Sequence, residues 1–346
     1  MSVYNKSGTA LSDVYGANGT SLERAYNIDG DEIYTKESDP ILLSDVASYY
    51  QTPVSDAVTS LNALSDDYVA FVIVTDTHSS TNSQNSQNIV RYLLKNSKAN
   101  KCFLLGDYSE NLWDETEYTT YATPLSSNCA SKVYATLGNH EWFGNASYSN
   151  LNQIYEDFLV NKSNVHGDKT HYYYYFDDTS HKLRYVVLNT ADGSMAGFST
   201  TQETWLATDA LQLPNSEWQV IIFGHHSLTG DDEVFGEYST SKTNTILSAF
   251  SLCNGTIIGY FHGHEHNDWV YTAGNGAVKC VSLACDKRGN SGYYADKGCP
   301  YAANRNAGTA NEQAVTIVMI NTTIGSVTFD RIGAIYMQEA DMAFNY

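Results

Sequence analysis

Residues that commonly bind metal ions gather in five short segments of the 346-residue chain. The segments read Asp76-Thr77-His78, Gly106-Asp107, Gly138-Asn139-His140-Glu141, Gly224-His225-His226 and His262-Gly263-His264-Glu265-His266. They contain seven of the ten histidines of the chain. Any one of these patterns is common in turns, but two imidazoles after a glycine turn can face one ion, and the ordered set of five predicts a metal site.

An apolar run precedes each segment and is short enough to be a buried strand. These runs are Tyr68–Thr75, Cys102–Leu105, Val133–Leu137, Val220–Phe223 and Thr256–Phe261. Open α/β sheets bind ligands at the carboxyl ends of their strands, so the five segments are expected to meet in space. The predicted metal ligands are Asp76, His78, Asp107, Asn139, His225, His264 and His266.

The remaining apolar residues predict how the strands are connected. Apolar residues at helical spacing from Asn88 to Leu94 indicate a crossover helix and hence a βαβ unit. A further strand is expected at Tyr185–Leu188. Val315–Ile320 and Ser326–Ile332 follow each other with a turn-sized gap, as antiparallel strands do. The expected fold is therefore α/β with mixed sheets.

The ordered segments also resemble a known family. The order Asp-x-His, Gly-Asp, Gly-Asn-His-Glu, Gly-His-His and Gly-His-x-His is similar to that of the calcineurin-like metallophosphoesterase superfamily, over about residues 68–335. The resemblance implies two mixed β-sheets packed as a sandwich and flanked by helices, with a dinuclear centre of Mn, Fe or Zn. It implies that one ion is held by Asp76, His78, Asp107 and His266, and the other by Asp107, Asn139, His225 and His264.

Electrostatics supports the sharing of Asp107 between two ions. Divalent ions about 3.5–4 Å apart repel each other, so a carboxylate and a hydroxide are needed between them. Two such ions, two carboxylates and one hydroxide leave a net charge of about +1, which the neutral carbonyl of Asn139 preserves. A phosphoryl group is attracted to this charge, and the bridging hydroxide would attack its phosphorus in line.

His140 and Asp107 are the predicted catalytic residues. The resemblance implies that His140 donates a proton to the leaving oxygen, and the alternative is that it orients a neighbouring ligand by a hydrogen bond. His226 and His262 are expected to pack or to orient ligands rather than to bind metal. The stretch from Tyr108 to Asn111 either lines the pocket or forms a solvated loop.

Three departures from related patterns narrow the prediction. Purple acid phosphatases place a tyrosine ligand three residues after the shared aspartate, where this chain has Glu110, so iron bound to tyrosinate is not expected. Ser/Thr phosphoprotein phosphatases follow that aspartate with an arginine, and the stretch Tyr108–Asn111 contains none. The stretch from His264 to Asp268 fits a metallo-β-lactamase pattern, but Trp269 stands where that pattern needs a histidine.

The acidic composition limits the partners that we expect. The chain has 39 Asp and Glu against 19 Lys and Arg, a formal charge of −20, which argues against extended nucleic acid as a partner. Small or surface-displayed phosphoesters remain suitable if metal supplies positive charge. No apolar run could span a bilayer and no secretory signal is seen, so we expect a soluble protein of the bacterial cytoplasm or a phage particle.

The six cysteines contain no C-x-x-C pair, which argues against a structural zinc knuckle. Buried free thiols are the expected state. A Cys285–Cys299 disulfide in an oxidising compartment is the alternative.

The amino terminus repeats itself every eleven residues. An aromatic residue, a glycine and an aliphatic residue recur in three copies: Tyr4, Gly8 and Leu11, then Tyr15, Gly19 and Leu22, then Tyr26, Gly30 and Ile33. Asn-Gly and Asp-Gly steps predict hairpins here. The repeat resembles those that begin tail-associated proteins of phages that infect Gram-positive bacteria. We therefore expect a β-repeat module over residues 1–36, a linker with short helices over 37–67, and the metallophosphoesterase catalytic domain over 68–346.

Two functions of different classes follow from these patterns. The first is metal-dependent hydrolysis of phosphodiesters or phosphomonoesters. The alternative is a phage tail or virion structural or receptor-binding protein whose metal site is a scaffold, in which the repeat associates with the tail or with itself.

Overall fold

A computed structural model describes residues 24–26, 32–35, 41–78, 83–110, 113–143, 147–228, 240–274, 276–287, 305–335 and 337–346. The chain forms two compact units, Met1–Leu42 and Leu43–Tyr346. In the first unit, strands β1 (Arg24–Tyr26) and β2 (Glu32–Thr35) pair antiparallel. Most of the Tyr/Gly repeat lies outside the described residues, so the β-repeat module stays a prediction.

The second unit contains a six-stranded mixed sheet, in the order β15-β14-β13-β3-β4-β5. Its strands are β3 (Tyr68–Val74), β4 (Cys102–Leu104), β5 (Val133–Ala135), β13 (Ala314–Asn321), β14 (Ser326–Gly333) and β15 (Phe344–Asn345). Strands β3, β4 and β5 are parallel neighbours, whereas β13 is antiparallel to both β3 and β14. The predicted βαβ unit and the antiparallel carboxyl-terminal strands are confirmed.

A seven-stranded mixed sheet faces the first, in the order β11-β12-β10-β9-β8-β7-β6. Its strands are β6 (His166–Asp168), β7 (Tyr173–Asp178), β8 (Leu183–Val187), β9 (Gln219–Phe223), β10 (Thr256–His262), β11 (Trp269–Ala273) and β12 (Val278–Ser282). The central strands β8, β9, β10 and β12 run parallel, and β7 and β11 are antiparallel to their neighbours in this core. Their carboxyl ends therefore share one edge of the sheet.

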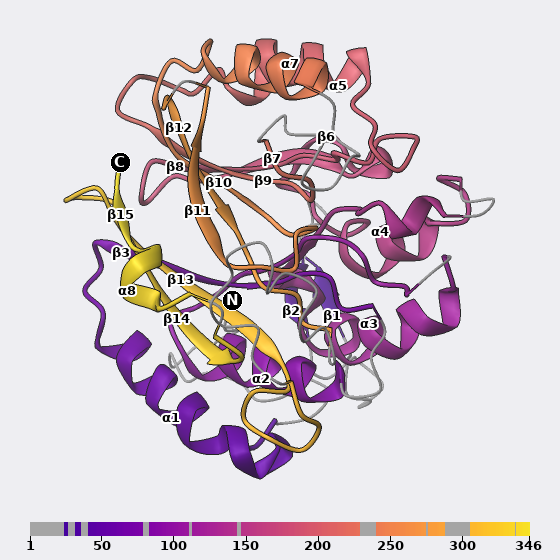
Figure 1. The fold of residues 1–346 in the computed structure, drawn as a ribbon, viewed down its shortest axis with the longest axis vertical. Coiled ribbons are helices and arrows are strands. Elements are labelled where there is room, and N and C mark those ends of the chain that lie inside the picture. Colours follow the sequence, from indigo (N-terminus) through magenta and orange to yellow (C-terminus); the bar gives the residue numbers. More distant parts are fainter. Residues whose placement is uncertain are drawn as a thin grey trace. The chain divides into compact units, whose positions relative to one another are not determined.

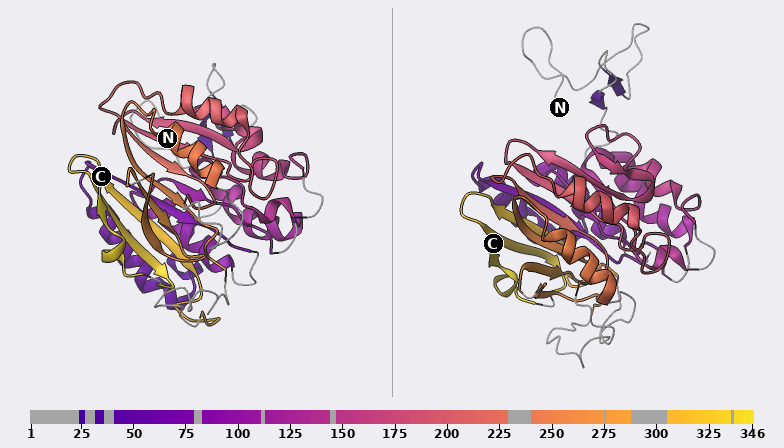
Figure 2. Two further views of the ribbon diagram at one scale, coloured as in Figure 1. Left: turned by 45° about the horizontal axis from the view of Figure 1, so that its top comes forward. Right: turned by 90° about the horizontal axis from the view of Figure 1, so that it is seen from above.

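Helices cover the outer faces of both sheets (Figures 1 and 2). On the six-stranded sheet, α1 (Ser48–Ala63) contacts β14 and α2 (Ser83–Asn96) contacts β13, with α3 (Glu115–Cys129) beside α2. The predicted crossover helix is part of α2. The seven-stranded sheet is covered by α5 (Thr200–Trp205), which continues as a π-helix at Leu206–Ala210, and by α7 (Thr240–Phe250). The expected sandwich with flanking helices is confirmed.

The remaining helical segments are short. They are α4 (Asn152–Phe158), α8 (Glu339–Met342), and the 3-10 turns Leu43–Asp45, Ala130–Lys132, His140–Trp142 and Lys169–His171. In the part of the chain that the structure describes, none of the helices is both long and apolar enough to cross a membrane. Five cysteines are free thiols, namely Cys102, Cys129, Cys253, Cys280 and Cys285. Cys299, the proposed partner of Cys285 in a disulfide, lies outside the described residues.

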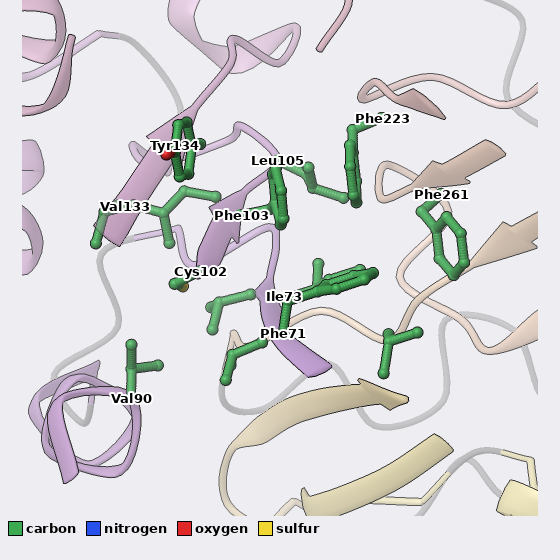
Figure 3. Close-up of a cluster of buried hydrophobic side chains, with 14 of the residues drawn as sticks. Phe71, Ile73, Val90, Cys102, Phe103, Leu105, Val133, Tyr134, Phe223 and Phe261 are labelled. Carbon is green, nitrogen blue, oxygen red and sulfur yellow. The ribbon is translucent and has the colours of Figure 1, made fainter. Parts of the chain in front are cut away.

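Aromatic rings from both sheets fill the space between them (Figure 3). Phe71 and Phe103 come from the six-stranded sheet, Phe223 and Phe261 come from the seven-stranded sheet, and all four are fully buried. The rings of Phe103 and Phe223 stack with centroids 3.8 Å apart, and Phe71 meets Phe103 edge to face at 5.3 Å. This packing sets the distance between the sheets, and so between the strand ends that carry the predicted ligands.

We expect Phe103→Ala to lower the free energy of unfolding by about 3–5 kcal/mol, because it removes buried area and leaves a cavity between rigid sheets. Chemical denaturation of the full chain measures this loss. Ile324→Ala is the control, since that side chain is 70% exposed, and its effect should stay within about 0.5 kcal/mol. Equal small losses in both variants would show that the sheets do not depend on this aromatic contact.

Candidate metal centre

The loops that carry the predicted ligands are hydrogen-bonded to one another at the strand ends. The N–H of Asp76 donates to the carbonyl of Gly106 at 3.1 Å, and the N–H of His78 donates to the carbonyl of Asp107 at 3.0 Å. In the other sheet, the N–H of Gly263 donates to the carbonyl of His225 at 3.1 Å, and across the sandwich the N–H of His264 donates to Oδ2 of Asp76 at 3.0 Å. These hydrogen bonds bring the loops after β3, β4, β9 and β10 to one place. This agrees with the expectation that α/β sheets bind ligands at the carboxyl ends of their strands.

One group of ligand atoms comes from Asp76, His78, Asp107 and His266, and these atoms all lie within 4.8 Å of one another. Nε2 of His78 lies 3.0 Å from Nε2 of His266, which in turn lies 3.2 Å from Oδ1 of Asp76. Two imidazole nitrogens and two carboxylate oxygens that converge on one point suit a divalent ion such as Mn, Fe or Zn. The donor set therefore fits a metal ion.

A second group lies on the other side of Asp107. Oδ1 of Asn139 lies 2.9 Å from Nε2 of His225 and 3.0 Å from Nδ1 of His264. Oδ2 of Asp107 lies 3.3 Å from Nε2 of His225 and 3.8 Å from Nε2 of His78. One carboxylate oxygen is thus near both groups, in the place that a shared ligand must take.

His226 and His262 were expected to pack or orient rather than to bind metal. Nδ1 of His226 lies 2.9 Å from the Thr190 hydroxyl, but ligand atoms of His225, His226 and His264 also lie within 4.8 Å of one another. His262 has Nδ1 beside the carbonyl of Gly263 and Nε2 beside the Tyr271 hydroxyl, at 2.9 and 3.0 Å. His262 is therefore held by its neighbours, while His226 borders the second group.

Five of the seven predicted ligands have a left-handed backbone. The φ angles are 52° at Asp76, 42° at His78, 55° at Asp107, 68° at His264 and 53° at His266. Each such residue costs on the order of 1 kcal/mol or more and persists only where the surroundings impose it. In the described chain, only two other non-glycine residues, Tyr172 and Lys182, have positive φ angles. The strain is therefore concentrated at the candidate site.

Glycines let these loops approach closely. A Cβ on Gly138 would lie 2.2 Å from Oδ1 of Asp107, and one on Gly263 would lie 2.0 Å from Oγ1 of Thr75 and 2.3 Å from Oδ2 of Asp76. No real Cβ contact is so short, so a side chain at either position would push a predicted ligand aside.

We expect Gly263→Ala to weaken metal binding by about 10–100-fold, the range typical of changes that misplace a ligand without removing it. Calorimetric titration of the metal-free protein with Mn²⁺ measures the change. Gly276→Ala is the control, because a Cβ at Gly276 meets nothing within 4 Å although φ there is +89°. Unchanged Mn²⁺ affinity in a folded Gly263→Ala protein would show that Asp76 is not a ligand.

The two aspartates are both ionised. Burial opposes ionisation of Asp76, but the neighbouring His266 lowers its pKa to about 2. Burial likewise opposes ionisation of Asp107, but the adjacent His225 holds its pKa well below the usual range. Two buried carboxylates side by side need nearby positive charge, which bound cations would supply.

The imidazoles of the predicted ligands divide into two sets by the direction in which their pKa is shifted. Burial lowers the pKa of His78 and of His264 to about 3, so these rings are neutral, which metal ligation requires. Burial also opposes a charge on His225, but the Asp107 carboxylate raises its pKa to about 9. In the absence of a cation, His225 therefore carries the proton that balances Asp107, and a metal ion would take over that role.

His140 lies at the partly exposed edge of the cluster. Its side chain is 22% exposed, with Nε2 3.9 Å from Oδ2 of Asp107. Its ring meets those of His78 and Phe143 edge to face, and its backbone N–H donates to Oδ1 of Asp107 at 2.9 Å. This position gives His140 access both to the predicted centre and to solvent.

Two interpretations were open for the stretch from Tyr108 to Asn111, a pocket lining or a solvated loop. Neither of them holds for all of its described residues. Tyr108 is buried, and its hydroxyl donates to the carbonyl of Thr136 at 2.9 Å, so this side chain belongs to the core. Glu110 is partly exposed and forms an ion pair with Lys287. Asn111 lies outside the described residues.

Three supporting residues were missed by the sequence reasoning. The buried carboxylate of Glu141 accepts hydrogen bonds from the backbone N–H groups of Asp107, Tyr108 and Gly138, at 2.9, 2.8 and 2.7 Å. Thr190 Oγ1 accepts from the N–H groups of His225 and His226. Cys285 is hydrogen-bonded to His266. Of these three residues, only Glu141 belongs to a recognisable motif, Gly-Asn-His-Glu.

Several solved structures are similar to this chain, and the first named here supports the fold. A dimetal phosphatase from Danio rerio is similar to this chain with a TM-score of 0.54 and 13% identity, over 77% of this chain and 96% of that chain. A phosphatase from Mycoplasma pneumoniae matches with a TM-score of 0.39 and 15% identity, over 77% and 92% of the two chains. A phosphopantetheinyl hydrolase from Mycobacterium tuberculosis matches with 0.39 and 12%, over 64% and 91%.

Among curated proteins, no sequence matches this chain. A family model described as calcineurin-like phosphoesterase matches residues 69–268, which is more than half of the chain and includes all seven predicted ligands. The chain therefore belongs to the calcineurin-like phosphoesterase family and is a phosphoesterase enzyme.

Proposed function

We propose that this chain hydrolyses phosphoesters with two metal ions that share Asp107. The observation that carries the proposal is the position of Asp107 Oδ2, within 4 Å of a nitrogen from each group of predicted ligands. Asp76, His78, Asp107 and His266 would hold one ion, and Asp107, Asn139, His225 and His264 the other. Bound divalent ions would activate a water nucleophile and stabilise the charge that develops on the phosphoryl oxygens.

The protein's own residues orient the reacting groups. Glu141 holds the Asp107 loop by accepting hydrogen bonds from the N–H groups of Asp107 and Tyr108, and a third bond, from the N–H of Gly138, ties this loop to that of Asn139. His140 is proposed to donate a proton to the leaving oxygen, because it is a partly exposed imidazole at the edge of the centre. Asn139 contributes a neutral oxygen, which leaves the site attractive to a phosphoryl group.

The proposed substrates are small or surface-displayed phosphoesters. Extended nucleic acid is disfavoured by the formal charge of −20, since a polyanion binds by contacts with Lys and Arg. Purified protein, loaded in turn with Mn²⁺, Zn²⁺ and Fe²⁺, should hydrolyse p-nitrophenyl phosphate or bis(p-nitrophenyl) phosphate. Metal analysis should find about two ions per chain. Turnover of neither substrate with any of these metals would contradict the proposal.

A second candidate function rests on the Tyr/Gly repeat of residues 1–36, which resembles phage tail-associated proteins. In this role the repeat would tether the chain to a tail or to itself. If the enzyme function is correct, Asp107→Asn phage particles should assemble and adsorb normally. Lost adsorption in that variant would favour a receptor-binding role.

A further inference from the structure

Lys287 and Glu110 form an ion pair beside the predicted metal centre. Nζ of Lys287 contacts Oε1 of Glu110, and the two side chains are 25% and 36% exposed. The backbone N–H of Lys287 donates to the carbonyl of Asp76 at 3.1 Å. Glu110 directly follows Ser109, whose carbonyl lies 3.2 Å from Nδ1 of His78. Contacts of the backbone of Lys287 and Ser109 therefore place the ion pair next to two predicted ligands, Asp76 and His78. These contacts do not involve the charged groups of the pair.

Lys287 offers a positive charge to solvent at this edge of a strongly acidic protein. Arg305 is also close, but it is only 4% exposed and its guanidinium donates to the carbonyl of Cys285. The side chain of Lys287, in contrast, is 25% exposed, so an anion from solvent can reach it. A cation in this position attracts anionic groups that approach the centre.

The contact of Lys287 with Glu110 can be replaced by a contact with another anion. Ion pairs this exposed contribute little to stability, because both charges keep their contacts with water. The loop does not depend on the pair, since the N–H of Glu110 also donates to Oε2 of Glu117 at 3.0 Å. An ammonium group has three donors and binds a phosphate oxygen as readily as a carboxylate oxygen.

We propose that Lys287 binds a second phosphate of the substrate, separate from the phosphoryl group that is cleaved, and that this phosphate displaces Glu110. The inference rests on the proposed function. It narrows the substrate class to phosphoesters that carry an additional phosphate group. Lys287 is then a specificity-determining residue, while bond cleavage depends on the metal centre.

The test compares two substrates with the same leaving group, namely the p-nitrophenyl ester of thymidine 5′-phosphate with and without a 3′-phosphate. In the Mn²⁺-loaded full chain, Lys287→Met should raise KM about tenfold for the ester with the 3′-phosphate and leave its kcat within about twofold. KM for the ester without it should not change. Glu110→Gln should lower KM for the 3′-phosphorylated ester, because it removes the competing carboxylate.

A remote ion pair supplies the matched controls. Lys182 and Glu217 contact each other at 2.5 Å, with side chains 53% and 69% exposed. Lys182→Met and Glu217→Gln should leave both KM values unchanged, and Lys287→Arg should keep the preference for the 3′-phosphate. Equal effects of Lys287→Met on both substrates, or a loss confined to kcat, would overturn the inference.

Binding without turnover separates this inference from the proposed function. Calorimetry with a non-hydrolysable phosphonate analogue of thymidine 3′,5′-bisphosphate should give a Kd about tenfold higher for Lys287→Met than for the wild type. If neither ester is hydrolysed but Kd still depends on Lys287, the proposed hydrolysis fails and the phosphate site stands. If Kd is the same in both proteins, Lys287 does not bind the second phosphate, whatever the turnover.

Discussion

Asp107→Asn is expected to lower kcat/KM for p-nitrophenyl phosphate by about 10³-fold or more. The substitution keeps the shape of the side chain but removes the charge that would hold two cations together. It also introduces an amide N–H₂ group beside nitrogens of His225 and His78, which lie 3.3 and 3.8 Å from Oδ2 of Asp107. A donor there cannot serve as a ligand.

Metal content is the decisive measurement for Asp107→Asn. Elemental analysis should fall from about two ions per chain to at most one, because the shared ligand is lost. Asp341→Asn is the control, since Asp341 is exposed on α8, and it should keep full metal content and activity. Circular dichroism should show that both variants are folded. An Asp107→Asn protein that retains both ions would disprove the sharing of this carboxylate.

The sequence predicts much of the site because the predicted ligands follow strands directly. The runs before Asp76, Asp107 and Asn139 form β3, β4 and β5, three parallel neighbours in one sheet. Parallel neighbours end at the same edge, so residues just beyond them meet whatever the rest of the chain does. The runs before His225 and His264 form the parallel pair β9 and β10 in the other sheet. Apolar patterning and order along the chain therefore suffice for these positions.

The supporting residues could not be predicted in this way. Thr190 follows β8 without a histidine or carboxylate beside it, and its role depends on β8 pairing with β9, which ends before His225. Cys285 reaches His266 because β12 pairs with β10. These contacts arise from how strands pair across the sheet, and a single threonine or cysteine carries no local pattern that indicates it.

One strand was missed because its pattern misleads. Strand β7 (Tyr173–Asp178) combines tyrosines with two aspartates and does not alternate, and its pairing with β8 places Asp177 where the buried Arg184 binds it through two hydrogen bonds, at 2.7 and 2.9 Å. The segment 37–67 was expected to be a linker with short helices. It contains α1, a 16-residue helix that buries Val54 and Leu61 in the main core.

His140→Ala is expected to lower kcat by about 10²–10⁴-fold for esters with a poor leaving group, the range for loss of a general acid. The loss should be much smaller for p-nitrophenyl phosphate, because p-nitrophenolate leaves without a proton. This difference separates the two roles that the sequence left open for His140. A proton donor matters in proportion to the basicity of the leaving oxygen, whereas a residue that only orients a ligand affects all leaving groups equally.

The measurement is kcat for a series of aryl and alkyl phosphate esters in the wild type and in His140→Ala, with metal content checked in both. His140 lies 3.9 Å from Asp107 and packs against His78, so its loss could also disturb the centre. His140→Asn is the matched variant, because it keeps a polar side chain of similar reach but cannot act as an acid at neutral pH. Equal losses across the series, accompanied by loss of metal, would assign His140 to ligand orientation. A loss that grows with the pKa of the leaving group, at full metal content, would identify it as the proton donor.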